Sequence, residues 1–239
     1  NGGAVMIQDS TFESIFTGST AGEYGAGGAI FVSDMKAPMT INRTLFKNNI
    51  GRGGGAIATR NTPDLSITIQ GSTFEGNTAR RRVGSGNSEC RGGAIFTKNK
   101  GPKLVIVDTR FSGNHADENR GGAIAMWSGA LVSVTDSIFA WNTLQSDSGM
   151  GSAIYLKHQA SVLHLIGTEN KFLNNQANAI TVDDKSQTDG FTELPGGVWQ
   201  SVQGSKNIIL SYCPVGKTTP ENTDKQRKWG EDIPKNQKK

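Results

Sequence analysis

The sequence predicts an all-β protein, a right-handed parallel β-helix (a solenoid) with an extended C-terminal tail. Three observations favour this fold class: a recurring Gly-Gly-Ala-Ile tetrapeptide, an alternating apolar stretch that ends in Phe, and an F-x-x-N motif that begins at that Phe. They return in the same order about every 27–30 residues, a length that suits a solenoid coil with two or three short strands.

The Gly-Gly-Ala-Ile element is interpreted as a corner of each coil. Small residues suit a place where two backbone segments approach closely, and glycine adopts positive φ there without steric cost. The element is complete at Gly27–Ile30, Gly54–Ile57, Gly92–Ile95 and Gly121–Ile124, and degenerate at Gly151–Ile154 and Ala177–Ile180. Its last residue is expected to form an interior ladder of Ile30, Ile57, Ile95, Ile124, Ile154 and Ile180.

The alternating stretch is interpreted as a half-buried strand. Between Leu65 and Phe74, the apolar Leu65, Ile67 and Ile69 alternate with polar residues, which is the period of a strand and not of a helix. The phenylalanine that ends each stretch is expected to stack on its equivalents in neighbouring coils. This second ladder comprises Phe12, Phe46, Phe74, Phe111, Phe139 and Phe172.

The asparagine of F-x-x-N is placed where the chain must turn. Asparagine tolerates left-handed backbone, and its amide can bond to the amide of the next coil, so we expect a third ladder. Its members are Asn49, Asn77, Asn114, Asn142 and Asn175, while Ile15 occupies the equivalent place in the first coil.

The Gly-Gly-Ala-Ile element combined with F-x-x-N resembles the repeat pair of the chlamydial polymorphic outer membrane proteins. The resemblance covers about residues 1–182. It implies a pectate-lyase-like, right-handed parallel β-helix that acts as a surface adhesin, and therefore an extracellular or cell-surface (secreted) location.

Three regions are expected along the chain. Residues 1–182 form the repeat coils, residues 183–212 a degenerate last coil, and residues 213–239 a charged extended tail that is disordered by composition. The chain begins without Met and half-way through a coil, which suggests a piece of a longer protein. No apolar run reaches the 18 or so residues of a membrane span.

Composition and cysteine usage restrict the chemistry. The net charge of +4 does not by itself indicate a nucleic-acid partner. Cys90 and Cys213 do not form a C-x-x-C pair, which argues against zinc, and their pairing with each other is left open. Gly51–Ala56 matches the dinucleotide fingerprint and Val215–Thr219 part of a phosphate loop, but both lack the required context, so we expect no cofactor.

Acidic residues raise two further possibilities. Asp9, Asp108 and Asp136 hold equivalent places three residues before Phe, where a stack of acids could bind Ca²⁺. Arg43 and Gly71 interrupt the series, so turn-capping acids and no metal site are expected. The pair Asp183–Asp184 is similar to the paired acids of β-helical glycosidases.

The expected function is non-catalytic: a surface or structural scaffold that mediates adhesion or assembly with protein partners or further copies. The alternative is a carbohydrate-active lyase or hydrolase. Arg80, Arg81 and Arg82 begin a long inserted loop, Ala79–Arg91, and are candidates for contact with a partner or an acidic glycan. No aromatic residues alternate with them, which argues against single-stranded nucleic acid. Asn42 lies in a glycosylation sequon.

Overall fold

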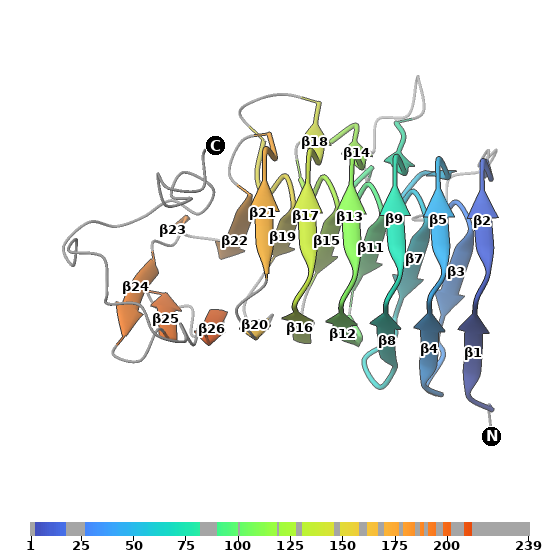
Figure 1. Ribbon diagram of the computed structural model, residues 1–239, viewed down its shortest axis with the longest axis horizontal. Coiled ribbons are helices and arrows are strands. Elements are labelled where there is room, and N and C mark those ends of the chain that lie inside the picture. The colour runs from blue at the N-terminus through green and yellow to red at the C-terminus, as the bar shows by residue number, and fades with distance from the viewer. Residues whose placement is uncertain are drawn as a thin grey trace.

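The computed structural model describes residues 3–17, 27–81, 90–99, 101–118, 120–127, 131–145, 149–157, 162–166, 170–176, 179–184, 187–188, 191–194, 198–201 and 208–211. Regular structure in these residues consists of strands alone, stacked coil upon coil along the long axis of the molecule (Figure 1). The predicted fold class, an all-β parallel β-helix, is confirmed. The expected tail, residues 213–239, lies outside the described residues.

Two of the four sheets carry the longer strands. The Ile sheet holds β3 (Ile30–Ser33), β7 (Ile57–Arg60), β11 (Ile95–Lys98), β15 (Ile124–Trp127), β19 (Ile154–Lys157) and β22 (Ile180–Asp184). The long sheet holds β1 (Val5–Gln8), β4 (Met39–Asn42), β8 (Ser66–Gln70), β12 (Lys103–Val107), β16 (Leu131–Thr135), β20 (Val162–Ile166) and β26 (Ile208–Ser211). All neighbours among these strands pair in parallel.

The other two sheets complete each coil. The Phe sheet holds β2 (Thr11–Glu13), β5 (Leu45–Lys47), β9 (Thr73–Glu75), β13 (Arg110–Ser112), β17 (Ile138–Ala140) and β21 (Lys171–Leu173). The short sheet holds β6 (Ile50–Gly51), β10 (Thr78–Ala79), β14 (His115–Ala116) and β18 (Thr143–Leu144). Antiparallel pairing enters only near the C-terminal end of the described strands, with β23 (Gln187–Thr188), β24 (Phe191–Leu194) and β25 (Val198–Ser201).

The inside of the coils is filled by residues that occupy the same position in successive coils. Ile57 pairs in register with Ile95, and Ile95 with Ile124, so one isoleucine follows another along the Ile sheet. The phenylalanine rings stack almost parallel, with centroids 4.7 Å apart between Phe46 and Phe74. These side chains are fully buried in the central coils, where they form one continuous hydrophobic core.

The Gly-Gly corner has a steric reason. A Cβ added to Gly93 would lie 2.1 Å from the carbonyl oxygen of Gly122 and 2.5 Å from the backbone nitrogen of His115. The first glycine of the same corner, Gly92, has a φ of +67°. Backbone therefore packs directly on backbone here, and the first position also needs the left-handed region that favours glycine.

The left-handed turn of F-x-x-N lies one residue earlier than expected. Asn48, Trp141 and Asn174 have φ between 50° and 53°, and each precedes the motif asparagine. The motif asparagines themselves have no positive φ in the described coils. The backbone conformation therefore does not explain why asparagine recurs at this position, and the reason must lie in the contacts of its side chain.

The outer face of the Ile sheet is also buried from β7 to β19, which the repeat pattern did not predict, while Phe31 on the same face of β3 is 48% exposed. Phe96, Ala125 and Tyr155 follow one another on this face and have no exposed area. Trp127 and Met150 pack against them. The Ile sheet thus has apolar contacts on both faces, as buried parallel sheets commonly do.

Candidate binding site at the stem of the inserted loop

The buried asparagines link consecutive coils. The Nδ2 of Asn77 donates to the Oδ1 of Asn114 at 3.0 Å and to the carbonyl oxygen of Phe46 at 2.9 Å. Its Oδ1 accepts from both the Nδ2 and the backbone nitrogen of Asn49. Both side-chain N–H groups and both oxygen lone pairs are therefore used, which is the condition for burying an amide.

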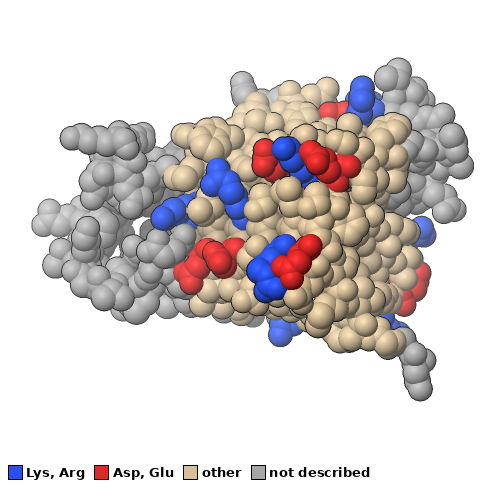
Figure 2. Space-filling view, turned by 45° about the vertical axis from the view of Figure 1, so that its right-hand side comes forward, with Lys and Arg blue, Asp and Glu red and all other residues tan. Residues whose placement is uncertain are grey.

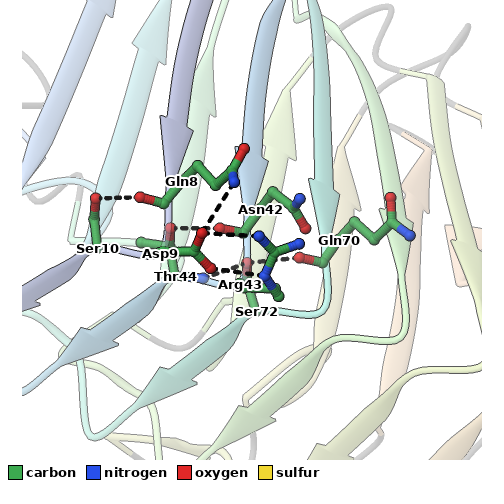
Figure 3. A network of polar contacts seen from close by, with 8 residues as sticks. All are labelled: Gln8, Asp9, Ser10, Asn42, Arg43, Thr44, Gln70 and Ser72. Atoms are coloured by element: carbon green, nitrogen blue, oxygen red, sulfur yellow. Dashed lines mark hydrogen bonds and ion pairs between the residues drawn. The ribbon is translucent and has the colours of Figure 1, made fainter.

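A second polar ladder was missed by sequence reasoning. The hydroxyl of Ser72 donates to the carbonyl oxygen of Gln70 at 2.9 Å and accepts from the backbone nitrogen of Thr44 at 3.1 Å (Figure 3). A serine or threonine stands two residues before Phe at Ser10, Thr44, Ser72, Thr109 and Ser137. The signal was visible in the sequence, because the repeat extends to [S/T]-x-F-x-x-N.

This ladder bears on the predicted glycosylation sequon. Thr44 is buried, and its hydroxyl donates to the carbonyl oxygen of Asn42 at 2.9 Å. The threonine therefore has a structural role that accounts for its presence without any glycan. Glycosylation of Asn42 stays a prediction.

The acidic residues that stand three residues before Phe all adopt left-handed backbone, at a turn of each coil. Asp9, Asp108 and Asp136 have φ of 45–48°, and so does Arg43 in the same row. Arg43 binds Asp9 through two hydrogen bonds of 2.7 and 2.8 Å (Figure 3), which lowers the pKa of the Asp9 carboxyl. Among the described residues, no group of three or more His, Cys, Asp or Glu is placed to hold a metal ion.

The inserted loop Ala79–Arg91 leaves the body of the coil through an anchored stem. At its first end, the backbone nitrogen of Arg81 donates to the Oδ2 of Asp117 at 2.7 Å. At its last end, the backbone nitrogen of Glu118 donates to the carbonyl oxygen of Cys90 at 3.1 Å. Two consecutive residues of the following coil, Asp117 and Glu118, thus hold both ends of the loop.

Arg91 adds a side-chain anchor. The side chain of Arg91 is buried, and its guanidinium forms an ion pair with the carboxylate of Glu118 and lies 4.4 Å from the centroid of the Trp127 ring. The Nζ of Lys157 lies 4.3 Å from the same ring centroid. These contacts tie the stem to the apolar outer face of the Ile sheet through cation–π interactions.

The arginines at the start of the loop are placed differently. Arg80 and Arg81 are both exposed, and neither guanidinium has an ion-pair or hydrogen-bond partner within the described residues. Arg82, the third predicted contact residue, lies outside the described residues, and so do the side chains of Asp183 and Asp184.

Hydrogen-bonding side chains lie beside this stem. The Nδ1 of His115 is 2.8 Å from the Oγ1 of Thr143, and its Nε2 is 3.3 Å from the Oδ1 of Asp117. Thr78 and Thr143 flank His115 in the register of the short sheet. Within the described part of the chain, the stem therefore combines two guanidinium groups that have no partner with polar side chains on a backbone that is held in place.

Cys90 is a structural part of the stem. Its thiol is free and buried, packed with Ala79, Ala116 and Leu144. Burial raises its pKa to about 11, and the negative charges of Glu118 and Asp117 add to the effect. Cys213 lies outside the described residues.

Comparisons with known proteins agree with the resemblance inferred from the repeat. Residues 71–98, which include β9, the inserted loop and β11, match the family model of the Chlamydia polymorphic membrane protein repeat. The chain is 27% identical to the probable autotransporter YfaL of Escherichia coli (strain K12), over 82% of this chain and 17% of that protein. No solved structure matches the chain.

Proposed function

We propose that this chain is a non-catalytic β-helical scaffold at the cell surface, which mediates adhesion or assembly through its inserted loop. The observation that carries the proposal is the anchored stem: Asp117 and Glu118 hold both ends of the longest insertion in the repeat. Binding residues are commonly found on loops that a rigid framework positions. The repeat match and the autotransporter relative support a location at the outer membrane or cell surface.

The stacked ladders supply the framework that such a role requires. Phenylalanine rings and asparagine amides connect each coil to the next, in addition to the hydrogen bonds of the four sheets. In a solenoid each unit contacts mainly its neighbours, so these inter-coil contacts determine stiffness along the axis. A stiff rod keeps a side loop at a defined place.

The distribution of surface charge also fits binding through a small part of the surface better than binding of a nucleic acid. Figure 2 shows one face of the molecule, on which acidic and basic side chains lie close together in small groups among uncharged ones. Nucleic-acid binding needs a continuous basic patch or stripe. The described residues on that face do not form one.

The proposal is tested by replacing residues 82–89 with a glycine-serine linker of the same length. Binding of the chain of residues 1–239 to cell surfaces, and its self-association in solution, are then measured by surface capture and by sedimentation. The expected result is loss of binding or association with unchanged far-UV circular dichroism. A matched control replaces residues 158–161 in the same way and should retain both. Equal behaviour of the two replacements would contradict the proposal.

A further inference from the structure

We propose that the stem of the inserted loop binds an anionic polysaccharide, with Arg80 and Arg81 as contact residues and Asp117 as a positioning residue. This inference rests on the proposed surface-binding function and names the class of ligand that the stem accepts. It is carried by the exposed cations, by the way their backbone is held, and by the side chains beside them.

The two arginines, Arg80 and Arg81, are exposed, and their guanidinium groups have no internal partner in the described part of the chain. Some other surface cations have partners, since Arg43 is held by Asp9 and Lys47 lies 3.9 Å from Glu13, whereas the side chains of Arg110 and Lys103 are exposed and, within the described residues, have no partner either. A guanidinium offers a fork of N–H donors that matches carboxylate and sulfate oxygens in two-point contacts. The stem therefore presents two such forks to solvent.

The backbone of both arginines is held in place by hydrogen bonds. The backbone nitrogen of Arg80 donates to the carbonyl oxygen of Gly51 at 2.8 Å, and that of Arg81 donates to Asp117 Oδ2 at 2.7 Å. Both contact residues thus start from backbone bonded to neighbouring coils. Less conformational entropy is lost when a ligand binds groups that are already positioned.

Polar side chains on the adjoining strands favour a polysaccharide over an acidic protein. Arg80 directly follows β10, and the register of the short sheet aligns Thr78 of that strand with His115 and Thr143, whose hydroxyl and imidazole groups can bond to sugar hydroxyls. Protein interfaces depend on central apolar or aromatic anchors. None of the large exposed hydrophobic side chains of the described residues belongs to β10, β14 or β18.

The test measures binding of heparin, a sulfated polysaccharide, to the chain of residues 1–239 by isothermal titration calorimetry. Dextran serves as the uncharged probe and poly-L-glutamate as the acidic polypeptide. The double variant Arg80→Ala/Arg81→Ala should lose about tenfold or more in heparin affinity, since it removes both guanidinium groups that contact the anion. The matched control, Lys36→Ala/Lys103→Ala, removes the same charge elsewhere on the surface and should change affinity less than about twofold.

A pair of variants at Asp117 separates positioning from charge. Asp117→Ala and Asp117→Asn remove the same negative charge, which by long-range electrostatics alone would raise the affinity for a polyanion. Only Asn keeps an oxygen that can accept from Arg81. Asp117→Ala should therefore lower heparin affinity and speed trypsin cleavage after Arg80 and Arg81, while Asp117→Asn should do neither.

Two results would overturn the proposed site. One is an equal loss of heparin affinity in the arginine and lysine double variants, and the other is tighter heparin binding by Asp117→Ala. If poly-L-glutamate binds as tightly as heparin and depends on the same arginines, the ligand is an acidic polypeptide and the polysaccharide assignment is wrong. A chain that adheres to surfaces but binds no probe overturns this inference alone. A chain that binds heparin without adhering overturns the proposed function alone.

Discussion

The side-chain Nδ2 of Asn77 donates to the Oδ1 of Asn114 at 3.0 Å, across 37 residues of sequence and a single coil of the solenoid. Both asparagines have no exposed area. The bond therefore joins two coils inside the protein, independently of the sheets. Because each of these two asparagines bonds to the asparagine of the next coil and to a backbone carbonyl of the preceding coil, removing one residue affects more than one coil.

Removal of one member should be costly. In Asn114→Ala, the Nδ2 and backbone nitrogen of Asn77 lose their shared acceptor, and the carbonyl oxygen of Phe74 loses a donor. Buried polar groups left without partners cost about 1–3 kcal/mol each, so a loss of about 3 kcal/mol in the free energy of unfolding is expected. Guanidinium chloride denaturation followed by circular dichroism measures it. The control is Asn99→Gly, which removes an exposed Asn99–Asn61 bond and keeps the left-handed backbone. If Asn99→Gly lowers the free energy of unfolding as much as Asn114→Ala does, burial of the asparagine is not the cause of the loss.

The corner glycines should differ sharply from the turn glycines. Gly93→Ala places a methyl group within 2.1 Å of the carbonyl oxygen of Gly122, so the coils must separate and the folded state should be lost or severely weakened. Gly113 has a φ of +62°, and an added Cβ meets nothing within 4 Å. Gly113→Asn, which suits left-handed backbone, should change stability by less than about 0.5 kcal/mol. Thermal unfolding of both variants tests this difference. A Gly93→Ala protein as stable as the unmodified chain would contradict the close approach of Gly93 to the backbone of Gly122.

Trp141 occupies a turn that suits asparagine or glycine. It has a φ of 52° and is 52% exposed, while Asn48 and Asn174 hold the same place in other coils. Left-handed backbone costs a bulky residue about 1–2 kcal/mol more than it costs glycine or asparagine. Trp141→Asn should therefore raise the free energy of unfolding by about 1 kcal/mol, seen as a higher denaturation midpoint at constant slope. A lower midpoint would mean that contacts of the indole outweigh the backbone strain.

The thiol of Cys90 should be inert in the folded protein. With its pKa raised to about 11, only about a thousandth of the thiol is ionised at pH 8, and the residue is buried. In a Cys213→Ser variant, iodoacetamide should alkylate Cys90 slowly in buffer and rapidly in denaturant, as mass spectrometry would show. Rapid alkylation in buffer would contradict the buried position. The rate should rise with pH, because the thiolate is the reactive form.

The candidate site was only partly predictable from the sequence. Arg80 and Arg81 stood out because they begin the longest insertion in an otherwise regular repeat. Asp117 and Glu118 carried no such signal, because Asp117 lies 36 residues after Arg81 and both belong to an ordinary loop of the next coil. Their role depends on which loops become neighbours when coils stack, and the spacing of motifs does not specify that contact.

What the sequence alone determined is the fold class and the residue types that recur in each coil. Period-two strands, a glycine corner and F-x-x-N that recur in the same order leave a parallel solenoid as the arrangement that buries the apolar residues. The tertiary structure decided that left-handed backbone falls on the residue before the motif asparagine, and that the Ile sheet is buried on its outer face as well. It also decided that the inserted loop is anchored by the following coil. These features depend on backbone and side-chain contacts between coils, and such contacts exist only once the coils are stacked.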